Sequence, residues 1–93
     1  MTIRVLSSAE KELTEAIEYY EQESTDAAIR FIDIFESTLE LIRVHPKRYP
    51  IYGKGIRAKV LEVFPFSVLY HVDDDEVVVI SLHHHKRSLE HLE

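Results

Sequence analysis

The sequence predicts an α+β fold with the element order β-α-α-β-β-β, in which a helical hairpin packs on one face of an antiparallel sheet. At 93 residues the chain fits one domain, residues 1–93, with one modest core. Its first half contains two segments in which apolar residues recur at helical spacing, and its second half contains three β-rich segments separated by turn residues. Because no repeat or linker interrupts this order, all elements are expected in one domain.

The first elements are a strand and a helix. Residues 3–6 form a short alternating run, which predicts a strand. Ser7 and Glu10 have the spacing of a capping box, in which each side chain bonds the backbone N–H of the other, so a helix is expected to begin here. Its apolar stripe has the spacing of one buried helix face, and glutamates occupy the outward positions. The stripe consists of Ala9, Leu13, Ala16, Ile17 and Tyr20.

A second helix and three further strands follow. Ser24-Thr25-Asp26 interrupts the first helix and offers a new N-cap, and Pro46 ends the second helix. The segment 46–55 contains two prolines and both glycines, so it is expected to be a loop. Strands are predicted at residues 56–63, 66–72 and 76–84, with a hairpin turn at the three aspartates 73–75. The apolar stripe of the second helix consists of Ala28, Phe31, Ile32, Phe35, Leu39 and Ile42.

Composition excludes several classes of protein. The chain has no cysteine, which excludes disulfides, thiolate zinc sites and cysteine nucleophiles, and is compatible with a reducing cytoplasm. Its longest aliphatic run, residues 77–80, is far too short to span a bilayer, so a soluble cytoplasmic protein is expected. Only Gly53 and Gly55 are available to build a phosphate-binding loop, so a nucleotide-dependent enzyme is not expected and no cofactor is implied.

Charge is distributed unevenly along the chain. Residues 1–43 hold four basic and ten acidic side chains, whereas residues 44–93 hold seven of each. Five of the basic residues fall in the thirteen residues 47–59, which contain no acid. This basic segment could attract phosphates or an acidic peptide, or could be a solvated loop, while the net charge of −6 weakens long-range attraction to nucleic acid.

Three consecutive histidines, His83 to His85, end the last predicted strand. Because strand residues alternate in direction, His83 and His85 are expected on one side and His84 on the other, with Leu82, Ile80 and Val78. Two histidines without further ligands make a poor metal site, so no metal is expected. The composition still permits metal-free phosphodiester cleavage, in which side chains transfer protons and cations stabilise the developing charge. The candidates are His84, His85, Lys86, Arg87, Arg57, Lys59 and Tyr70; the alternative is that Tyr70 packs in the sheet and the cations are surface residues.

Several short motifs follow one another along nearly the whole chain. They are Tyr19-Tyr20 near the end of the first helix, Ala28 to Phe31 in the second, His45-Pro46 at its close, Arg57, Phe64-Pro65-Phe66, Tyr70 three residues after Ser67, and His84-x-x-Arg87. In this order and spacing they resemble the RelE/ParE superfamily of toxins from bacterial type II toxin–antitoxin systems, and within it the ParE branch.

The resemblance implies a small toxin that a cognate ParD-like antitoxin neutralises, with the disordered C-terminal segment of the antitoxin folding over the helical hairpin and sheet in a hetero-oligomer. The superfamily divides by target. RelE-like toxins cut mRNA at the ribosome with basic residues on the open sheet face, whereas ParE-like toxins are associated with inhibition of DNA gyrase. The expected antitoxin contacts are apolar residues of the hairpin: Leu13, Ile17, Tyr20, Phe31 and Phe35.

The choice between these branches depends on cations. Aligned on Tyr70, the ribonuclease branch has two lysines where this chain has Ala58 and Val60, and an arginine where it has Ser67. Such donors commonly contribute ~3 kcal/mol each to transition-state stabilisation. The sequence therefore favours a plasmid-stabilisation-type toxin that binds and inhibits DNA gyrase rather than an enzyme. The expected target-binding residues are His84, Lys86, Arg87 and Arg57.

Two alternatives stay open. One is a RelE-like, metal-independent endoribonuclease that uses the candidates above on ribosome-bound mRNA, because histidines can serve as acid and base near neutral pH. The other is a degenerate member that only binds its antitoxin. The ParE tail usually continues from His-x-x-Arg into an acid-proline pair and an aromatic residue, whereas this chain has Ser88-Leu89 and Leu92 there.

Overall fold

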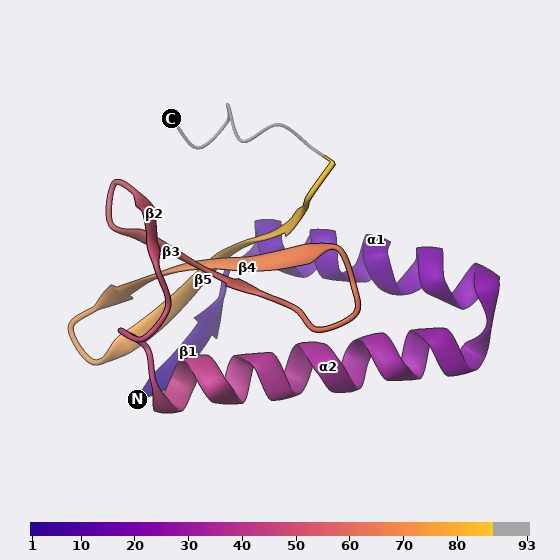
Figure 1. Ribbon diagram of the computed structural model, residues 1–93, viewed down its shortest axis with the longest axis horizontal. Helices are drawn as coiled ribbons and strands as arrows, with labels where there is room; N and C mark the ends of the chain where they lie inside the picture. The colour runs from indigo at the N-terminus through magenta and orange to yellow at the C-terminus, as the bar shows by residue number, and fades with distance from the viewer. Residues whose placement is uncertain (87–93) are drawn as a thin grey trace.

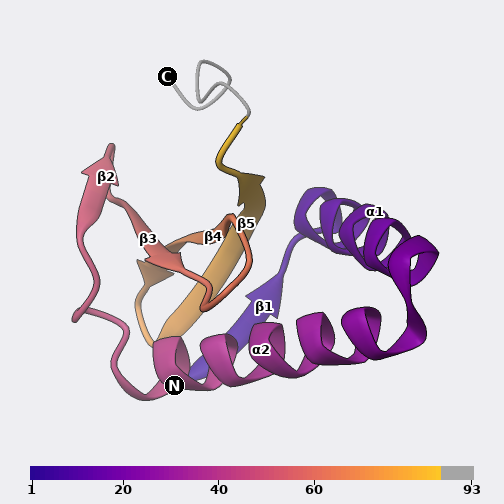
Figure 2. The same cartoon turned by 45° about the vertical axis from the view of Figure 1, so that its right-hand side comes forward.

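The computed structural model describes residues 1–86 and confirms the predicted α+β fold, with two helices against one five-stranded sheet (Figure 1). Both helices lie on the same side of the sheet, and the closed end of their hairpin projects beyond it (Figure 2). The elements in chain order are β1 (Thr2–Val5), α1 (Ser7–Glu23), α2 (Thr25–Val44), β2 (Ile51–Gly53), β3 (Ile56–Val60), β4 (Phe66–Asp73) and β5 (Glu76–His84).

The sheet has the strand order β1-β5-β4-β3-β2. The predicted antiparallel pairing holds for β2 to β5, whereas β1 pairs with β5 in parallel. Two strands that run in parallel need a long connection, and here the whole helical hairpin lies between β1 and the strands that follow. A second correction concerns residues 46–55, which were expected to be a loop throughout, because residues 51–53 form the short edge strand β2.

The two helices begin differently from one another. Ser24 caps α2 as predicted, because its Oγ accepts the Ala27 N–H at 3.0 Å. The capping box predicted at Ser7 is absent: Leu6 occupies the N-cap position and makes no side-chain cap bond. The hydroxyl of the next serine, Ser8, donates to the Ile80 carbonyl at 3.1 Å. The start of α1 is therefore attached to β5 rather than capped by its own side chains.

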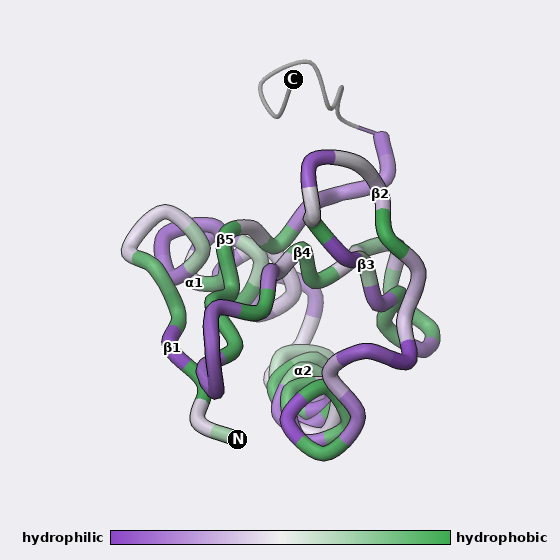
Figure 3. The backbone as a smooth tube through the Cα atoms, turned by 90° about the vertical axis from the view of Figure 1, so that its left-hand side faces the viewer, coloured by the Kyte–Doolittle hydropathy of each residue, from purple (hydrophilic) through white to green (hydrophobic). Residues whose placement is uncertain are grey.

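The core lies between the helices and the side of the sheet that faces them. In Figure 3, which looks along α2, hydrophobic and hydrophilic residues alternate around the helix, as expected for a helix buried on one side. Fully or almost fully buried side chains from α2 meet those of β4 and β5. The buried cluster includes Ala9, Ala16, Tyr20, Ala28, Phe31, Phe35, Ile42, Leu61, Phe66, Val68, Tyr70, Val77, Val79 and Leu82.

A β-bulge in β5 changes which residues face the helices. Leu69 of β4 pairs with Ser81, but its neighbour Tyr70 pairs with Val79, so Ile80 is left without a partner in β4. An extra residue on one strand reverses the alternation beyond it. Val77 and Val79 face the core before the bulge and Leu82 faces it afterwards. The prediction that His84 shares its side with Val78 and Ile80 is therefore wrong, although His84 does share it with Leu82.

Candidate functional site

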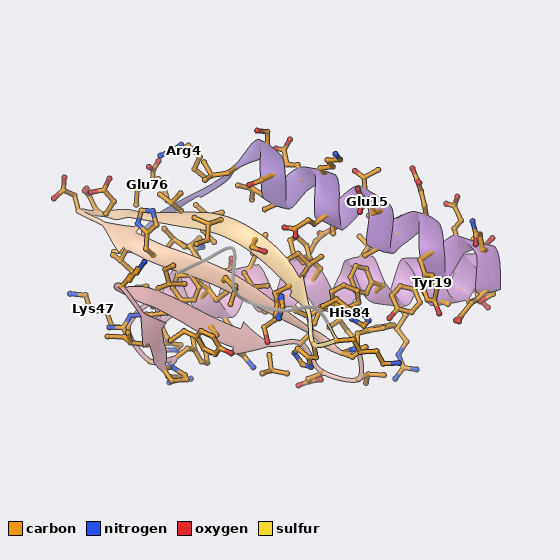
Figure 4. The ribbon with its side chains drawn as sticks, turned by 90° about the horizontal axis from the view of Figure 1, so that it is seen from above. Arg4, Glu15, Tyr19, Lys47, Glu76 and His84 are labelled. Atoms are coloured by element: carbon orange, nitrogen blue, oxygen red, sulfur yellow. The ribbon has the colours of Figure 1, made fainter. Side chains whose placement is uncertain are left out.

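An open groove of about 690 Å³ lies between α1 and the end of β5. Side chains from the helix form one wall, and the last residues of β5 with the turn before β4 form the other. Figure 4 labels Glu15 and Tyr19 from the first wall and His84 from the second. The lining residues are Glu12, Glu15, Ala16, Tyr19, Tyr20, Glu23, Pro65, Phe66, Leu82, His84 and Lys86. We call this feature the α1–β5 groove.

The groove exists because α1 replaces β1 beside the second half of β5. The ladder between β1 and β5 ends where the Leu6 N–H donates to the Val79 carbonyl at 3.0 Å. Beyond that point, Glu12 Oε1 accepts the Ser81 hydroxyl at 3.0 Å and the Leu82 N–H at 3.1 Å. A carboxylate acceptor makes such bonds stronger than those between neutral groups. Glu12 thus satisfies a strand edge that would otherwise lie unpaired, and the helix diverges from β5 after it.

Aromatic rings form the floor of the groove. The Tyr20 ring stacks on Phe31 at 5.0 Å between centroids and meets Phe66 edge-on at 6.4 Å. Phe66 in turn meets the His84 ring at 4.9 Å, almost perpendicular to it. Burial, with smaller contributions from Tyr19 and Glu23, raises the pKa of the Tyr20 hydroxyl. The half-buried His84 ring therefore packs against the aromatic floor of the groove.

The charges of the two walls differ. Glu15 and Glu23 are exposed on α1, whereas His84 and Lys86 lie on the opposite wall. The Lys86 N–H donates to His84 Nδ1 at 3.1 Å, which fixes the local backbone against that imidazole. A groove with an apolar floor, an acidic wall and a basic wall is suited to an amphipathic peptide segment rather than to a small anion.

The open face of the sheet carries a second, smaller cavity of about 300 Å³, lined by Tyr52, Ala58, Ser67, Leu69, His83 and His85. His83 and His85 share this face, as predicted from strand alternation. Ser67 Oγ lies 2.9 Å from His85 Nε2. No lysine or arginine among residues 1–86 lines this cavity. His84 and His85 therefore belong to different surfaces and do not form one catalytic pair.

Three further nuclease candidates, Tyr70, Arg57 and Lys59, bond to backbone carbonyls within the fold. Tyr70 is completely buried, and its hydroxyl donates to the Pro46 carbonyl at 2.7 Å. Burial raises the pKa of this hydroxyl to about 12. The Arg57 guanidinium donates to the carbonyls of Lys47 at 3.2 Å and Tyr49 at 2.7 Å. Tyr70 was predicted either as a nuclease residue or as a residue packed in the sheet. The structure supports packing in the sheet.

Lys59 is also held by its neighbours. Its Nζ donates to the Val60 carbonyl at 3.1 Å and lies 5.2 Å from the centre of the Tyr49 ring. Arg57 and Lys59 thus stabilise the connection before β2 rather than line a cavity with the histidines. Among residues 1–86, no three histidine, cysteine or carboxylate side chains gather as metal ligands. Within the same part of the chain, no helix is long and apolar enough to cross a membrane.

One family model matches nearly the whole chain and identifies its family. The family model described as "ParE toxin of type II toxin-antitoxin system, parDE" matches residues 3–89. The chain belongs to the ParE toxin family. The ParE membership expected from the sequence motifs is thereby confirmed.

A solved structure agrees with this ParE assignment at the level of the fold. The chain superimposes on a structure titled "Chromosomal ParDE TA system from P. aeruginosa" with a TM-score of 0.79 and 17% identity, covering 90% of this chain and 95% of that chain. No curated protein matches the sequence. At this identity the structural likeness shows a shared fold, and the family match carries the assignment to a toxin of a type II toxin–antitoxin system.

The ParE fold places the predicted antitoxin contacts mainly in its own core. Tyr20, Phe31 and Phe35 are 8%, 0% and 5% exposed, and the partly buried Leu13 and Ile17 pack against the same cluster. These side chains hold the helices on the sheet. A partner that docks on this fold as it stands meets the side chains beside them, such as Tyr19, which is 59% exposed.

The predicted target-binding residues are dispersed in this ParE toxin. His84 and Lys86 lie together at the end of β5, whereas Arg57 is bonded to carbonyls of residues 47–49. Arg87 and the tail with Leu89, His91 and Leu92 lie outside the described residues. The sequence predicts Glu12 and Glu15 on the outward side of the first helix and assigns no role to Glu23, whereas all three line the groove. The spacing of Ser8 and Glu12, one helical turn apart, was an available signal.

Proposed function

We propose that this ParE toxin inhibits DNA gyrase and that a cognate ParD-like antitoxin neutralises it. The observation that carries the proposal is the absence, among the described residues, of a lysine or arginine in the open-face cavity, together with the burial of Tyr70. RNA cleavage needs cations and a proton-transfer group that can reach the substrate. Among residues 1–86, this cavity offers histidines but no lysine or arginine to stabilise the developing charge, which favours binding to a protein target over catalysis on mRNA.

The proposed target contacts are at the end of β5. Lys86 is exposed and His84 half-exposed, and both precede Arg87 in the sequence. His84 and Lys86 lie together at the end of β5, on a protein whose net charge is −6. Arg57 contributes indirectly in this proposal, because its guanidinium is already bonded to backbone carbonyls.

Neutralisation follows from the position of the same residues. His84 and Lys86 also form the basic wall of the α1–β5 groove. An antitoxin segment that is disordered when free and folds into this groove would cover both side chains, so the toxin could not contact its target at the same time. The proposal places the toxin in the cytoplasm, as part of a hetero-oligomer, where gyrase is present.

A gyrase supercoiling assay beside a translation assay tests the proposed function. The purified toxin is expected to block supercoiling, and the antitoxin from the neighbouring reading frame is expected to copurify with the toxin and restore supercoiling. Unimpaired supercoiling with codon-linked mRNA cleavage would instead establish the ribonuclease. Normal growth of cells that contain verified soluble toxin would instead support the third hypothesis, a degenerate family member that only binds its antitoxin.

A further inference from the structure

The turn between β3 and β4 holds a valine in an unusual backbone conformation. Val63 has φ +70° and is 70% exposed. The Phe64 N–H donates to the Glu62 carbonyl at 2.7 Å, which closes a γ-turn with Val63 at its centre. A second such bond follows at once, from the Phe66 N–H to the Phe64 carbonyl at 2.8 Å around Pro65. Two consecutive γ-turns therefore connect the strands.

The first of these turns is strained. A γ-turn with a positive central φ is the rarer and less stable of the two forms, whereas the fixed φ of proline suits the other form. A β-branched residue at positive φ is an outlier, because its side chain crowds the backbone there. Glycine would adopt this conformation without strain. The valine also gains little from burial, since most of its surface faces solvent.

The surrounding structure keeps the turn in this shape. The Phe64 ring packs edge-on against Tyr20 at 4.8 Å and Phe31 at 5.0 Å, so one side of the turn is anchored in the core. The Pro65 carbonyl accepts the His85 N–H at 2.9 Å, which attaches the other side to the end of β5. Local strain that a fold maintains in this way is concentrated at functional sites.

The turn is continuous with the α1–β5 groove. Pro65 and Phe66 line the groove, and Val63 stands two residues before Pro65. Figure 1 shows this connection at the end of the sheet that faces the closed end of the hairpin. Leu61, at the start of the same connection, is buried at 3% exposure, so Val63 is the aliphatic side chain that the connection presents to solvent.

We propose that the strained turn is an anchor for the antitoxin, with Val63 presented to an apolar side chain of the antitoxin segment that occupies the adjoining groove. The proposal rests on the proposed function, because it requires an antitoxin in the groove. The occupant is defined by the chemistry of the walls: a peptide with apolar residues toward Tyr20 and Phe66, a basic residue toward Glu15 or Glu23, and an acidic residue toward Lys86. Its chain then leaves the groove past Pro65 and covers Val63.

Substitutions that relieve the strain test this anchor. Val63→Gly and Val63→Asn both suit a positive φ and both remove the aliphatic group. The toxin is coexpressed with the antitoxin from the neighbouring reading frame, and the rate at which labelled antitoxin exchanges is measured on the purified complex. Both variants are expected to release the antitoxin about tenfold faster than the wild type, equivalent to about 1.4 kcal/mol. The urea midpoint of the refolded free toxin is expected to stay the same or rise.

Val44→Ala is the matched control, because Val44 is an exposed valine at 52% on the far end of α2 and should leave exchange unchanged. Unchanged exchange in both Val63 variants would overturn the anchor while leaving the toxin–antitoxin assignment intact. Faster exchange accompanied by a lower urea midpoint in both would show that the turn is only a structural support. If the wild-type toxin binds no antitoxin, the proposed function fails, and the anchor fails with it.

Discussion

The two faces of the sheet near the end of β5 differ although they are built from alternating residues of the same two strands. Phe66, Leu82 and His84 face the helices and line the α1–β5 groove, whereas Ser67 and His85 face the open side. The groove side combines an aromatic floor with opposite charges on its walls, while the open side has a small cavity without lysine or arginine among the described residues. The histidine run therefore contributes to two surfaces, of which the groove side combines the apolar floor and opposite charges that suit a peptide.

The largest expected difference between the faces is in stability. Phe66→Ala removes a buried ring from the aromatic floor and should lower the free energy of unfolding by about 3–5 kcal/mol. Ser67→Ala, at the neighbouring position on the open face, removes one hydrogen bond and should cost about 1 kcal/mol or less. Urea denaturation of both variants measures the difference. Equal losses would contradict the view that the groove side holds the fold together.

A smaller effect is expected at the contact that creates the groove. Glu12→Ala leaves the Leu82 N–H and the Ser81 hydroxyl without their acceptor and should destabilise the protein by about 1–3 kcal/mol. Glu12→Gln keeps an acceptor oxygen and should lose less. Glu18→Ala, an exposed glutamate on the same helix, should change stability by no more than about 0.5 kcal/mol. Indistinguishable urea midpoints for Glu12→Ala and Glu18→Ala would show that α1 does not depend on this contact.

The two faces should also differ in their effect on the proposed target. His84→Ala is expected to weaken inhibition of gyrase supercoiling roughly tenfold, the loss of one contact of about 1.4 kcal/mol. Arg87→Ala should act in the same direction. His85→Ala and His83→Ala, on the open face, should change inhibition little once folding has been verified by circular dichroism. If the open-face substitutions weaken inhibition more than His84→Ala does, the target site lies on the open side.

The smallest expected effect is on how stability depends on pH. It is compared between one tyrosine on the helix-facing side of the sheet and one on the open side. The pKa of Tyr70 rises to about 12 in the folded protein, from its ordinary value of 10.0, because burial favours the neutral phenol. A raised pKa stabilises the fold below pH 10, and this contribution is lost as pH increases through about 12. Tyr70→Phe should cost about 1 kcal/mol at neutral pH, through the lost bond to Pro46, and should flatten the decline above pH 10.

Tyr52→Phe is the control for this pair, because Tyr52 is 60% exposed on the open face. Its unfolding curves between pH 8 and pH 11.5, from about two units below to about 1.5 units above the ordinary tyrosine pKa, should follow those of the wild type. A Tyr70→Phe variant with an alkaline decline as steep as that of the wild type would show that another group causes it.

Much of the fold could be predicted because it depends on local patterns. The helical spacing of Phe31, Phe35 and Ile42 identified the buried side of α2, and Ser24 has the side chain that an N-cap requires. Strand alternation placed His83 and His85 on the same side because no bulge intervenes between them. The order and spacing of the motifs were sufficient to predict membership of the ParE family. These features need only the chemistry of neighbouring residues, which is present in any linear sequence.

The site depended instead on contacts between distant residues. The bulge at Ile80 shifted the alternation of side chains between the two faces of β5 before His84, and the Ser8 hydroxyl bonds to β5 near the start of α1, where the sequence predicts a capping box. The helical pattern predicts Glu12 on the outward side of its helix, yet its carboxylate accepts the N–H of Leu82, seventy residues away. Sequence alone determined both helices, the strands other than β2 and the family, since propensity and periodicity are local. Only the tertiary structure decided which side chains meet in the groove, because strand register and the partners of polar groups are set when α1, β4 and β5 pack together.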